Sequence, residues 1–327
     1  MDAQPLDGIT VPEHFVPTPG TISPQAQAFL RMKLPFETHK MPAVGDIVGW
    51  KAFRETSDAA IVHMSQKFVD RYPCKSVTHQ LSASQIYEIT PDNLAPENRN
   101  RVIYYVHGGG FTGGGGEAAR VLGVQTAGTA RCKVYAIDYR LAPEFPFPAP
   151  LDDTLEGYRH ILKTHKPETV AVYGLSAGAN LTAAVVLKAR DTGLPMPAAC
   201  AMHSCPSDMG HVGDSANANV VIDIILRRPM PELSVNYAGS HDVKDPYLSP
   251  VYGDFSKGFP PSILTTGTRD LLLSNTVRQH RAMVRGGVDA ELHVWEAMTH
   301  APFLGAPEEE ELYMQHVSFM LEHMAKS

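Results

Sequence analysis

The amino-acid sequence predicts an α/β fold, in which helices cover both faces of a mostly parallel sheet and a helical cap adjoins it. Three observations lead to this prediction. From residue 76 onward, apolar segments of strand length alternate with helical segments. The first 75 residues are rich in proline and contain helical patterns without a convincing strand. A long segment that begins at residue 205 interrupts the alternation, as inserted functional segments often do.

Eight segments have the composition of β-strands. The first two, 77–81 and 85–90, alternate polar and apolar residues, which is typical of antiparallel strands. The other six are mostly apolar, as strands buried on both faces should be. They are residues 101–106, 133–138, 170–174, 199–204, 263–267 and 290–295.

Helical patterns fill the intervals between these strands. They cover residues 117–130, 151–163, 177–192 and 274–285. A last helix is expected over 307–325, because Tyr313, Val317, Met320 and Met324 recur on one helical face. Before the first strand, residues 23–34 and 46–69 have amphipathic helical patterns. The interrupting segment contains one further helical run, over 219–226.

These patterns predict a cap made of two separate segments. Residues 1–75 form its N-terminal part and 205–250 its second part, while 76–204 and 251–327 form the α/β core. Apolar cap residues predict a pocket for an apolar group, although we expect most of them to pack the cap against the core. They are Phe29, Leu30, Phe36, Trp50, Phe53, Ile222, Ile225 and Leu226.

The composition excludes several classes of protein. The chain has 327 residues, of which 43% are hydrophobic and 19% charged, so it is not a disordered protein. Its net charge of −7 argues against a nucleic-acid partner. The N-terminus lacks a signal-peptide pattern, and the densest apolar run, 220–226, is too short to span a membrane. We therefore expect a cytoplasmic protein. Its cysteines are expected to be reduced thiols rather than zinc ligands: Cys74, Cys132, Cys200 and Cys205.

A glycine-rich loop follows the strand at 101–106. Residues 108–116 contain seven glycines in nine positions, and no Lys-Ser/Thr pair follows, so a P-loop is excluded. Gly108, Gly110 and Gly113 match the dinucleotide-binding pattern, with Asp138 at the end of the next strand as the acidic residue. The same glycines also suit a nest of backbone N–H groups that stabilises the oxyanion of an acyl-transfer intermediate. A glycine turn without a ligand is the third interpretation.

The strongest catalytic signal is the sequence GLSAG at 174–178, at a predicted junction between a strand and a helix. A G-x-S-x-G motif in this context makes a sharp turn that projects the serine from the edge of the sheet. The small residues on either side let the strand and the helix pack closely. A serine that only caps a helix would explain Ser176 but not both glycines.

A serine nucleophile needs a base, and the base needs an orienting carboxylate. In this type of fold the chain order is serine, acid, histidine. Asp270 follows the next-to-last predicted strand, and His300 follows the last one. Position favours Asp270 over Asp289, which precedes the last strand, and over Glu296, which lies nearer to His300 in the sequence.

Three motifs together resemble a known family. HGGGF at 107–111, DYRLAPE at 138–144 and GLSAG at 174–178 are similar to motifs of the bacterial hormone-sensitive-lipase-like carboxylesterases, in the α/β-hydrolase superfamily. The segment 245–253 also resembles that family, and the resemblance covers residues 75–327. It implies the α/β-hydrolase fold with a mostly parallel eight-stranded sheet. Leu175, Ala179 and Leu271 depart from the usual motifs, which suggests a subgroup.

The resemblance implies a serine hydrolase that acts on short- to medium-chain or small apolar carboxylic esters. Ser176 would be the nucleophile, His300 the general base and Asp270 its partner. The oxyanion hole would consist of the backbone N–H groups of Gly109, Gly110 and Ala177. His107 would hold the glycine-rich loop in place. Four further residues would brace the site rather than react, and we call them the bracing residues: Asp138, Tyr139, Arg140 and Glu144.

Other functions remain as alternatives at this point. A lactone hydrolase would use the same three residues on a cyclic ester. An NAD(P)-dependent oxidoreductase would use the glycine-rich loop, but it leaves GLSAG, Asp270 and His300 unexplained. A non-catalytic binding module usually lacks a triad member, and none is missing here. For the hydrolase we expect no metal or organic cofactor. Relatives in the family are often dimers, so a homodimer is one alternative, but the sequence does not determine the oligomeric state.

Overall fold

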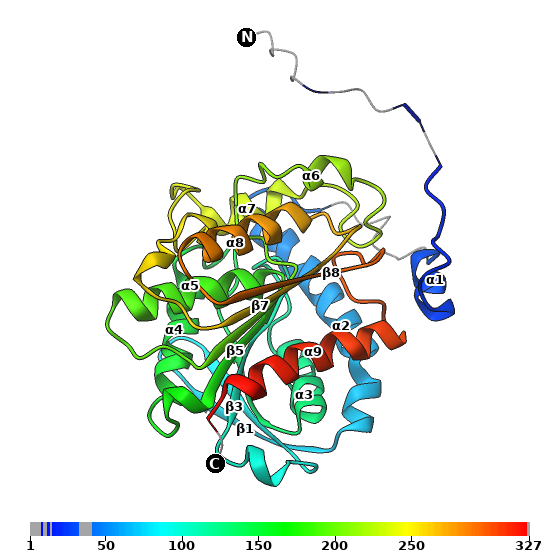
Figure 1. The fold of residues 1–327 in the computed structure, drawn as a ribbon. Helices are drawn as coiled ribbons and strands as arrows, with labels where there is room; N and C mark the ends of the chain where they lie inside the picture. Colours follow the sequence, from blue (N-terminus) through cyan, green and yellow to red (C-terminus); the bar gives the residue numbers. More distant parts are fainter. Residues whose placement is uncertain (1–7, 9–11, 14, 33–40, 326–327) are drawn as a thin grey trace.

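A single eight-stranded sheet organises the protein (Figure 1). The structure is a computed structural model that describes residues 8, 12, 13, 15–32 and 41–325. The strands lie in the order β1-β2-β4-β3-β5-β6-β7-β8. Their bounds are Cys74–Gln80, Gln85–Pro91, Val102–Val106 and Lys133–Asp138 for β1 to β4, and Val170–Leu175, Ala199–His203, Ser262–Gly267 and Ala290–Trp295 for β5 to β8.

The parallel and antiparallel parts of the sheet follow the two sequence patterns. β2 pairs antiparallel with both β1 and β4, whereas the pairs from β4 through β3 to β8 are all parallel. The central strands β3, β5, β6 and β7 are buried along almost their whole length. The prediction of a mostly parallel, eight-stranded sheet is therefore confirmed.

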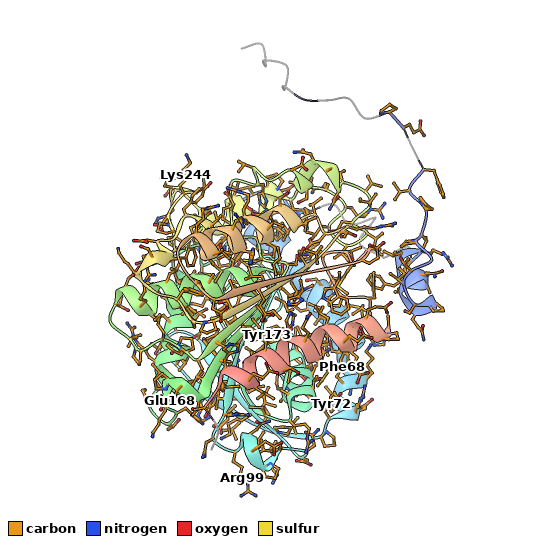
Figure 2. All side chains as sticks on the ribbon, in the orientation of Figure 1. Phe68, Tyr72, Arg99, Glu168, Tyr173 and Lys244 are labelled. Atoms are coloured by element: carbon orange, nitrogen blue, oxygen red, sulfur yellow. The ribbon has the colours of Figure 1, made fainter. Side chains whose placement is uncertain are left out.

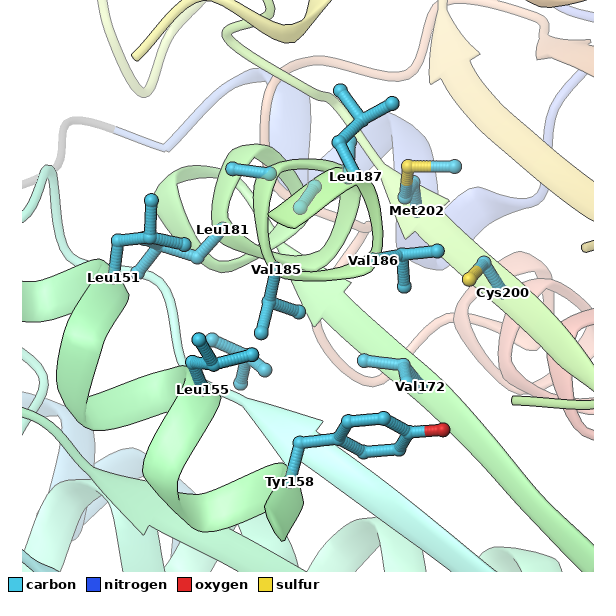
Figure 3. Close-up of a cluster of buried hydrophobic side chains, with 14 of the residues drawn as sticks. Leu151, Leu155, Tyr158, Val172, Leu181, Val185, Val186, Leu187, Cys200 and Met202 are labelled. Carbon is cyan, nitrogen blue, oxygen red and sulfur yellow. The ribbon is translucent and has the colours of Figure 1, made fainter. Parts of the chain in front are cut away.

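Helices cover both faces of the sheet. α4 (Ala149–Ile161), α5 (Ala177–Asp191) and α8 (Leu273–Arg285) pack on one face, and α3 (Glu117–Ala130) and α9 (Pro307–His323) on the other. Figure 3 shows side chains of α4 and α5 meeting over the sheet, with Leu155, Tyr158 and Val185 packed near Val172 of β5. On the opposite face, Tyr173 of β5 is buried against α9, where its ring centroid lies 5.2 Å from that of His316 (Figure 2).

Two helices precede the sheet in the described part of the chain. α1 (Pro24–Leu30) is capped by the Ser23 hydroxyl, which accepts from the N–H of Ala26, and Phe29 packs edge-on against Phe303. α2 (Ile47–Arg71) is capped by Asp46 and lies beside α3. Both helices were predicted, but residues 33 and 34 of the first pattern, and Phe36, lie outside the described residues.

The insertion between β6 and β7 differs from its prediction. A helix was expected over 219–226, but these residues form turns between α6 (Ser215–Ala218) and α7 (Pro231–Ala238). Val221 and Arg227 adopt left-handed backbone conformations, with φ of 72° and 58°. The carboxylate of Asp223 accepts hydrogen bonds from the N–H groups of Ile225 and Leu226. An aspartate that binds nearby N–H groups in this way favours a turn over a helix.

The proposed division into two cap segments and two core segments stays a prediction. The structure does bring the N-terminal part and the insertion into contact, because Gly45 donates a backbone hydrogen bond to the Asn236 side chain at 2.9 Å. The N-terminal part also reaches the core through α2 and α3. In the described part of the chain, no helix is both long and apolar enough to cross a membrane.

Candidate active site

Ser176 occupies a strained turn between β5 and α5. Its φ is 53°, a conformation that a residue other than glycine rarely adopts. The turn is possible because the neighbouring backbones pack closely: a Cβ on Gly174 would overlap with the Gly178 carbonyl group, and one on Gly178 with the Val106 carbonyl group. The backbone N–H of Ser176 donates to the carbonyl of His203 at 2.9 Å. The serine is thus held at the carboxyl end of the central strands.

His300 and Asp270 approach Ser176 from two loops far along the chain. His300 Nε2 lies 2.9 Å from Ser176 Oγ, and His300 Nδ1 lies 3.6 Å from Asp270 Oδ1. Asp270 is fully buried, and it accepts hydrogen bonds from the Thr266 hydroxyl at 2.6 Å and from the Leu272 N–H at 2.8 Å. The structure therefore brings all three predicted residues together. The competing acids Asp289 and Glu296 are both exposed.

Electrostatics distinguish His300 from other buried histidines. Burial lowers the pKa of His203 to about 4, and it also lowers the pKa of His316. Burial acts in the same direction on His300, but the adjacent carboxylate of Asp270, together with the charge of Asp223, outweighs it, so the His300 pKa is raised. An imidazole in this setting can accept a proton from the serine hydroxyl.

The glycine-rich loop places backbone N–H groups beside Ser176. Gly109 and Gly110 have φ of 112° and 60°, which glycine adopts without strain. Among the described residues, no carbonyl accepts a hydrogen bond from the N–H of Gly109, Gly110 or Ala177. A Cβ on Gly108 would come within 3.3 Å of Ser176 Cβ, so the loop lies directly against the serine. Such unpaired donors can stabilise a developing oxyanion.

A small cavity of about 60 Å³ adjoins these groups. The end of the cavity that we expect to be reactive is lined by Ser176, His300, Gly110 and Ala177. Its remaining lining is mostly apolar, and it comes from the insertion, from the loop after β7 and from Phe111 of the glycine-rich loop. The apolar lining includes Leu226, Met230, Leu233, Leu271 and Leu272. Of the apolar cap residues singled out in the sequence, Leu226 lines this cavity, whereas Phe29 and Trp50 are buried in packing contacts.

Comparisons with known proteins agree with this arrangement. A family model described as the α/β-hydrolase fold matches residues 103–304. The chain belongs to the α/β-hydrolase family. It is 31% identical over 202 residues to an acetyl-hydrolase of Streptomyces hygroscopicus, a match that covers 61% of this chain and 67% of the relative. It is also 31% identical over 212 residues to the carboxylesterase NlhH of Mycobacterium tuberculosis, a match that covers 61% of this chain and 65% of the relative.

Solved structures of esterases also match this hydrolase, over nearly its whole length. Esterase E25 superposes with a TM-score of 0.89 at 31% identity, covering 97% of this chain and 99% of that one. A hormone-sensitive lipase from a metagenome library superposes with a TM-score of 0.80 at 26% identity, covering 93% and 100%. The predicted resemblance, the fold and the assignment to carboxylesterase-type enzymes are therefore confirmed.

Two of the predicted bracing residues, Asp138 and Tyr139, contact the glycine-rich loop and the strand before it. Asp138 accepts hydrogen bonds from the Gly116 N–H at 2.8 Å and from the Gln85 and Tyr87 side chains, so it ties the glycine-rich loop to β2. The His107 ring stacks on Tyr139 at 4.0 Å, and the Tyr139 hydroxyl donates to the His107 carbonyl.

The remaining two bracing residues form ion pairs. Arg140 pairs with the buried Asp153 through two hydrogen bonds, at 2.8 and 2.9 Å. Glu144 pairs with Arg54 of α2 at 3.0 Å. Sequence reasoning missed Arg54, because nothing in the pattern of α2 shows that it faces the core. Arg54 also donates to the Thr112 carbonyl at 2.6 Å, so it joins the N-terminal helix to the glycine-rich loop.

Two further residues near the triad were not predicted. Ser204, which follows β6 with φ of 47°, places its hydroxyl 2.6 Å from His300 Nδ1. Asp223, from the insertion, accepts from the Leu271 N–H at 2.8 Å, next to Asp270. The position of Ser204 at the end of a strand beside β5 was a signal that could have identified it. Asp223 gave no such signal, since it lies within an apolar run.

The packing around the turn predicts that Gly178 cannot be replaced. In Gly178→Ala the new methyl group would overlap with the carbonyl groups of Val106 and His107, and strain of this kind typically costs about 2 kcal/mol of unfolding free energy. We expect a clear fall in Tm on thermal unfolding. Gly20→Ala, at an exposed site with open space around it, is the control and should change the unfolding free energy by less than about 0.5 kcal/mol. Equal Tm values for the two variants would contradict the packing argument.

Proposed function

We propose that this protein hydrolyses carboxylic esters through Ser176, with an acyl-enzyme intermediate, and that its substrates are short- to medium-chain or small apolar esters. The observation that carries the proposal is the 2.9 Å contact of Ser176 Oγ with His300 Nε2, beside N–H groups of the glycine-rich loop that have no carbonyl partner among the described residues. The sequence relatives named acetyl-hydrolase and carboxylesterase support the same class of substrate.

The reaction follows from the positions of these groups. Ser176 Oγ bonds to the ester carbonyl carbon while His300 takes the hydroxyl proton, and Asp270 stabilises the resulting imidazolium. The negative carbonyl oxygen accepts hydrogen bonds from Gly109, Gly110 and Ala177. The bond to the alcohol oxygen then breaks, and His300 protonates the leaving alcohol. Water attacks the acyl group with His300 as base, which releases the carboxylic acid and restores Ser176.

Replacement of the nucleophile tests the proposal directly. We expect Ser176→Ala to lower kcat for p-nitrophenyl butyrate by roughly 10⁴- to 10⁶-fold, because a triad serine has no substitute in the acylation step. The exposed Ser256, replaced by alanine, is the matched control and should keep the wild-type rate. Mass spectrometry after treatment with an organophosphonate should show one adduct, at Ser176. Wild-type turnover by Ser176→Ala would refute the proposal.

The raised His300 pKa predicts the pH profile. His300 acts as a base only when neutral, so kcat/KM should fall as the pH falls through its pKa, above the ~6.5 of an unperturbed histidine. The charge of Asp223 helps to raise this pKa. In Asp223→Asn the acidic limb should therefore move to lower pH. The exposed Asp214, replaced by asparagine, should leave the profile unchanged. A limb that moves to higher pH in Asp223→Asn would contradict this account.

Ser204 is proposed to position the base. Its hydroxyl lies closer to His300 Nδ1 than Asp270 does, at 2.6 Å against 3.6 Å, and it also helps to lower the Asp270 pKa. Without this hydroxyl the imidazole loses one of the two groups that orient it. We expect Ser204→Ala to lower kcat about tenfold with little change in KM, measured on p-nitrophenyl butyrate. A change confined to KM would assign Ser204 to substrate binding instead.

A further inference from the structure

The cavity beside Ser176 contains one polar pair that the reaction does not use. Its apolar wall is interrupted by His211 and Ser234, both from the insertion between β6 and β7. His211 Nε2 and Ser234 Oγ are hydrogen-bonded to each other. Neither side chain has another hydrogen bond within the described residues. Apart from the reactive end, these two side chains are the polar ones that line this cavity.

The position of His211 is tightly fixed. It follows a turn built on Asp208, whose carboxylate accepts from the Gly210 N–H and whose carbonyl accepts from the His211 N–H. Asp208 is itself held by Arg278 at 2.7 Å and by the Tyr252 hydroxyl at 2.9 Å. The turn leaves His211 with φ of 50°, a strained value for a residue with a side chain. Such strain at a cavity wall is typical of functional positions.

His211 and Ser234 can make more hydrogen bonds than the single one that joins them. Burial lowers the His211 pKa, against the opposing charge of Asp208, so the imidazole is neutral near pH 7. A neutral imidazole has one N–H donor and one acceptor nitrogen. If Nε2 accepts from Ser234, the N–H at Nδ1 is left over; if Nε2 donates, the Ser234 hydroxyl proton is left over. In either tautomer one donor remains available for a further hydrogen-bonding partner.

We propose that His211 and Ser234 form a polar subsite for a second oxygen-bearing group of the substrate, a hydroxyl or carbonyl placed away from the ester that is cleaved. The inference rests on the proposed esterase function and narrows its substrate class. The preferred substrates are short esters with a hydroxyl or oxo group in the acyl part or in the alcohol part. A site built to hydrogen-bond such a group rejects the analogue that lacks it, because its own polar atoms are then left unpaired.

Matched pairs of esters test the subsite, because a methyl group replaces a hydroxyl at nearly constant size. The acyl arm compares p-nitrophenyl 3-hydroxybutyrate with p-nitrophenyl 3-methylbutyrate. The alcohol arm compares 2-hydroxyethyl butyrate with propyl butyrate, and here hydrolysis is measured as the release of acid. In the wild-type protein we expect kcat/KM to favour the hydroxylated ester about tenfold or more in one arm, and that arm identifies which part of the substrate reaches the subsite.

Two variants test whether the pair is responsible. Ser234→Ala removes the hydroxyl, and His211→Asn removes the imidazole with a residue that tolerates a positive φ. Each should reduce the hydroxyl-to-methyl preference to near one, while kcat/KM for the methyl analogue stays within about threefold of wild type. Val235→Ala is the control: Val235 is the next residue on α7, is 47% exposed and does not line the cavity, so the preference should persist.

The outcomes separate this inference from the function on which it rests. Rapid hydrolysis of all four esters with a preference near one in both arms would overturn the polar subsite and leave the esterase function standing. A preference that persists in both Ser234→Ala and His211→Asn would also overturn it. Failure to hydrolyse any of the four esters, together with failure of an organophosphonate to label Ser176, would instead refute the proposed function.

Discussion

The site depends on one constraint, the close approach of three backbone segments around Ser176. β5 and α5 meet at Gly174 and Gly178, and β3 passes so near that a side chain on Gly178 would overlap with its last carbonyl group. This packing forces Ser176 into a left-handed conformation and points its hydroxyl away from the sheet. The strain is tolerated because the flanking elements are buried and paired on both sides.

The glycine-rich loop needs external support, since seven glycines in nine positions leave its backbone with much conformational freedom. Side chains from other segments supply this support. Asp58 of α2 accepts from the Gly114 N–H at 2.7 Å, and Arg54 donates to the Thr112 carbonyl. Asp138 accepts from Gly116. The N-terminal helix therefore holds the loop that lies against Ser176, so a helix outside the sheet supports the candidate site.

Much of the core could be predicted because its signals are local. Buried strands are apolar, the G-x-S-x-G turn requires small residues, and the acid and the histidine follow the last two strands in a fixed order. Asp270 and His300 could be selected among many carboxylates and histidines on that basis. Ser204, Asp223 and Arg54 could not, because their contacts join segments far apart in the sequence and depend on how the insertion and α2 pack.

The helix predicted over 219–226 is absent for a related reason: contacts that are not visible in the local pattern decide the structure there. The apolar pattern alone favours a helix, but Asp223 is buried and bonds to nearby N–H groups and to Leu271. Turning the chain at this point has a structural consequence. One carboxylate holds both Leu226, in the wall of the cavity, and Leu271, next to Asp270. The same charge adds to that of Asp270 in raising the His300 pKa, so one side chain contributes both to the shape of the cavity and to the basicity of the proposed catalytic histidine. A change in the insertion that moves Asp223 must therefore alter both.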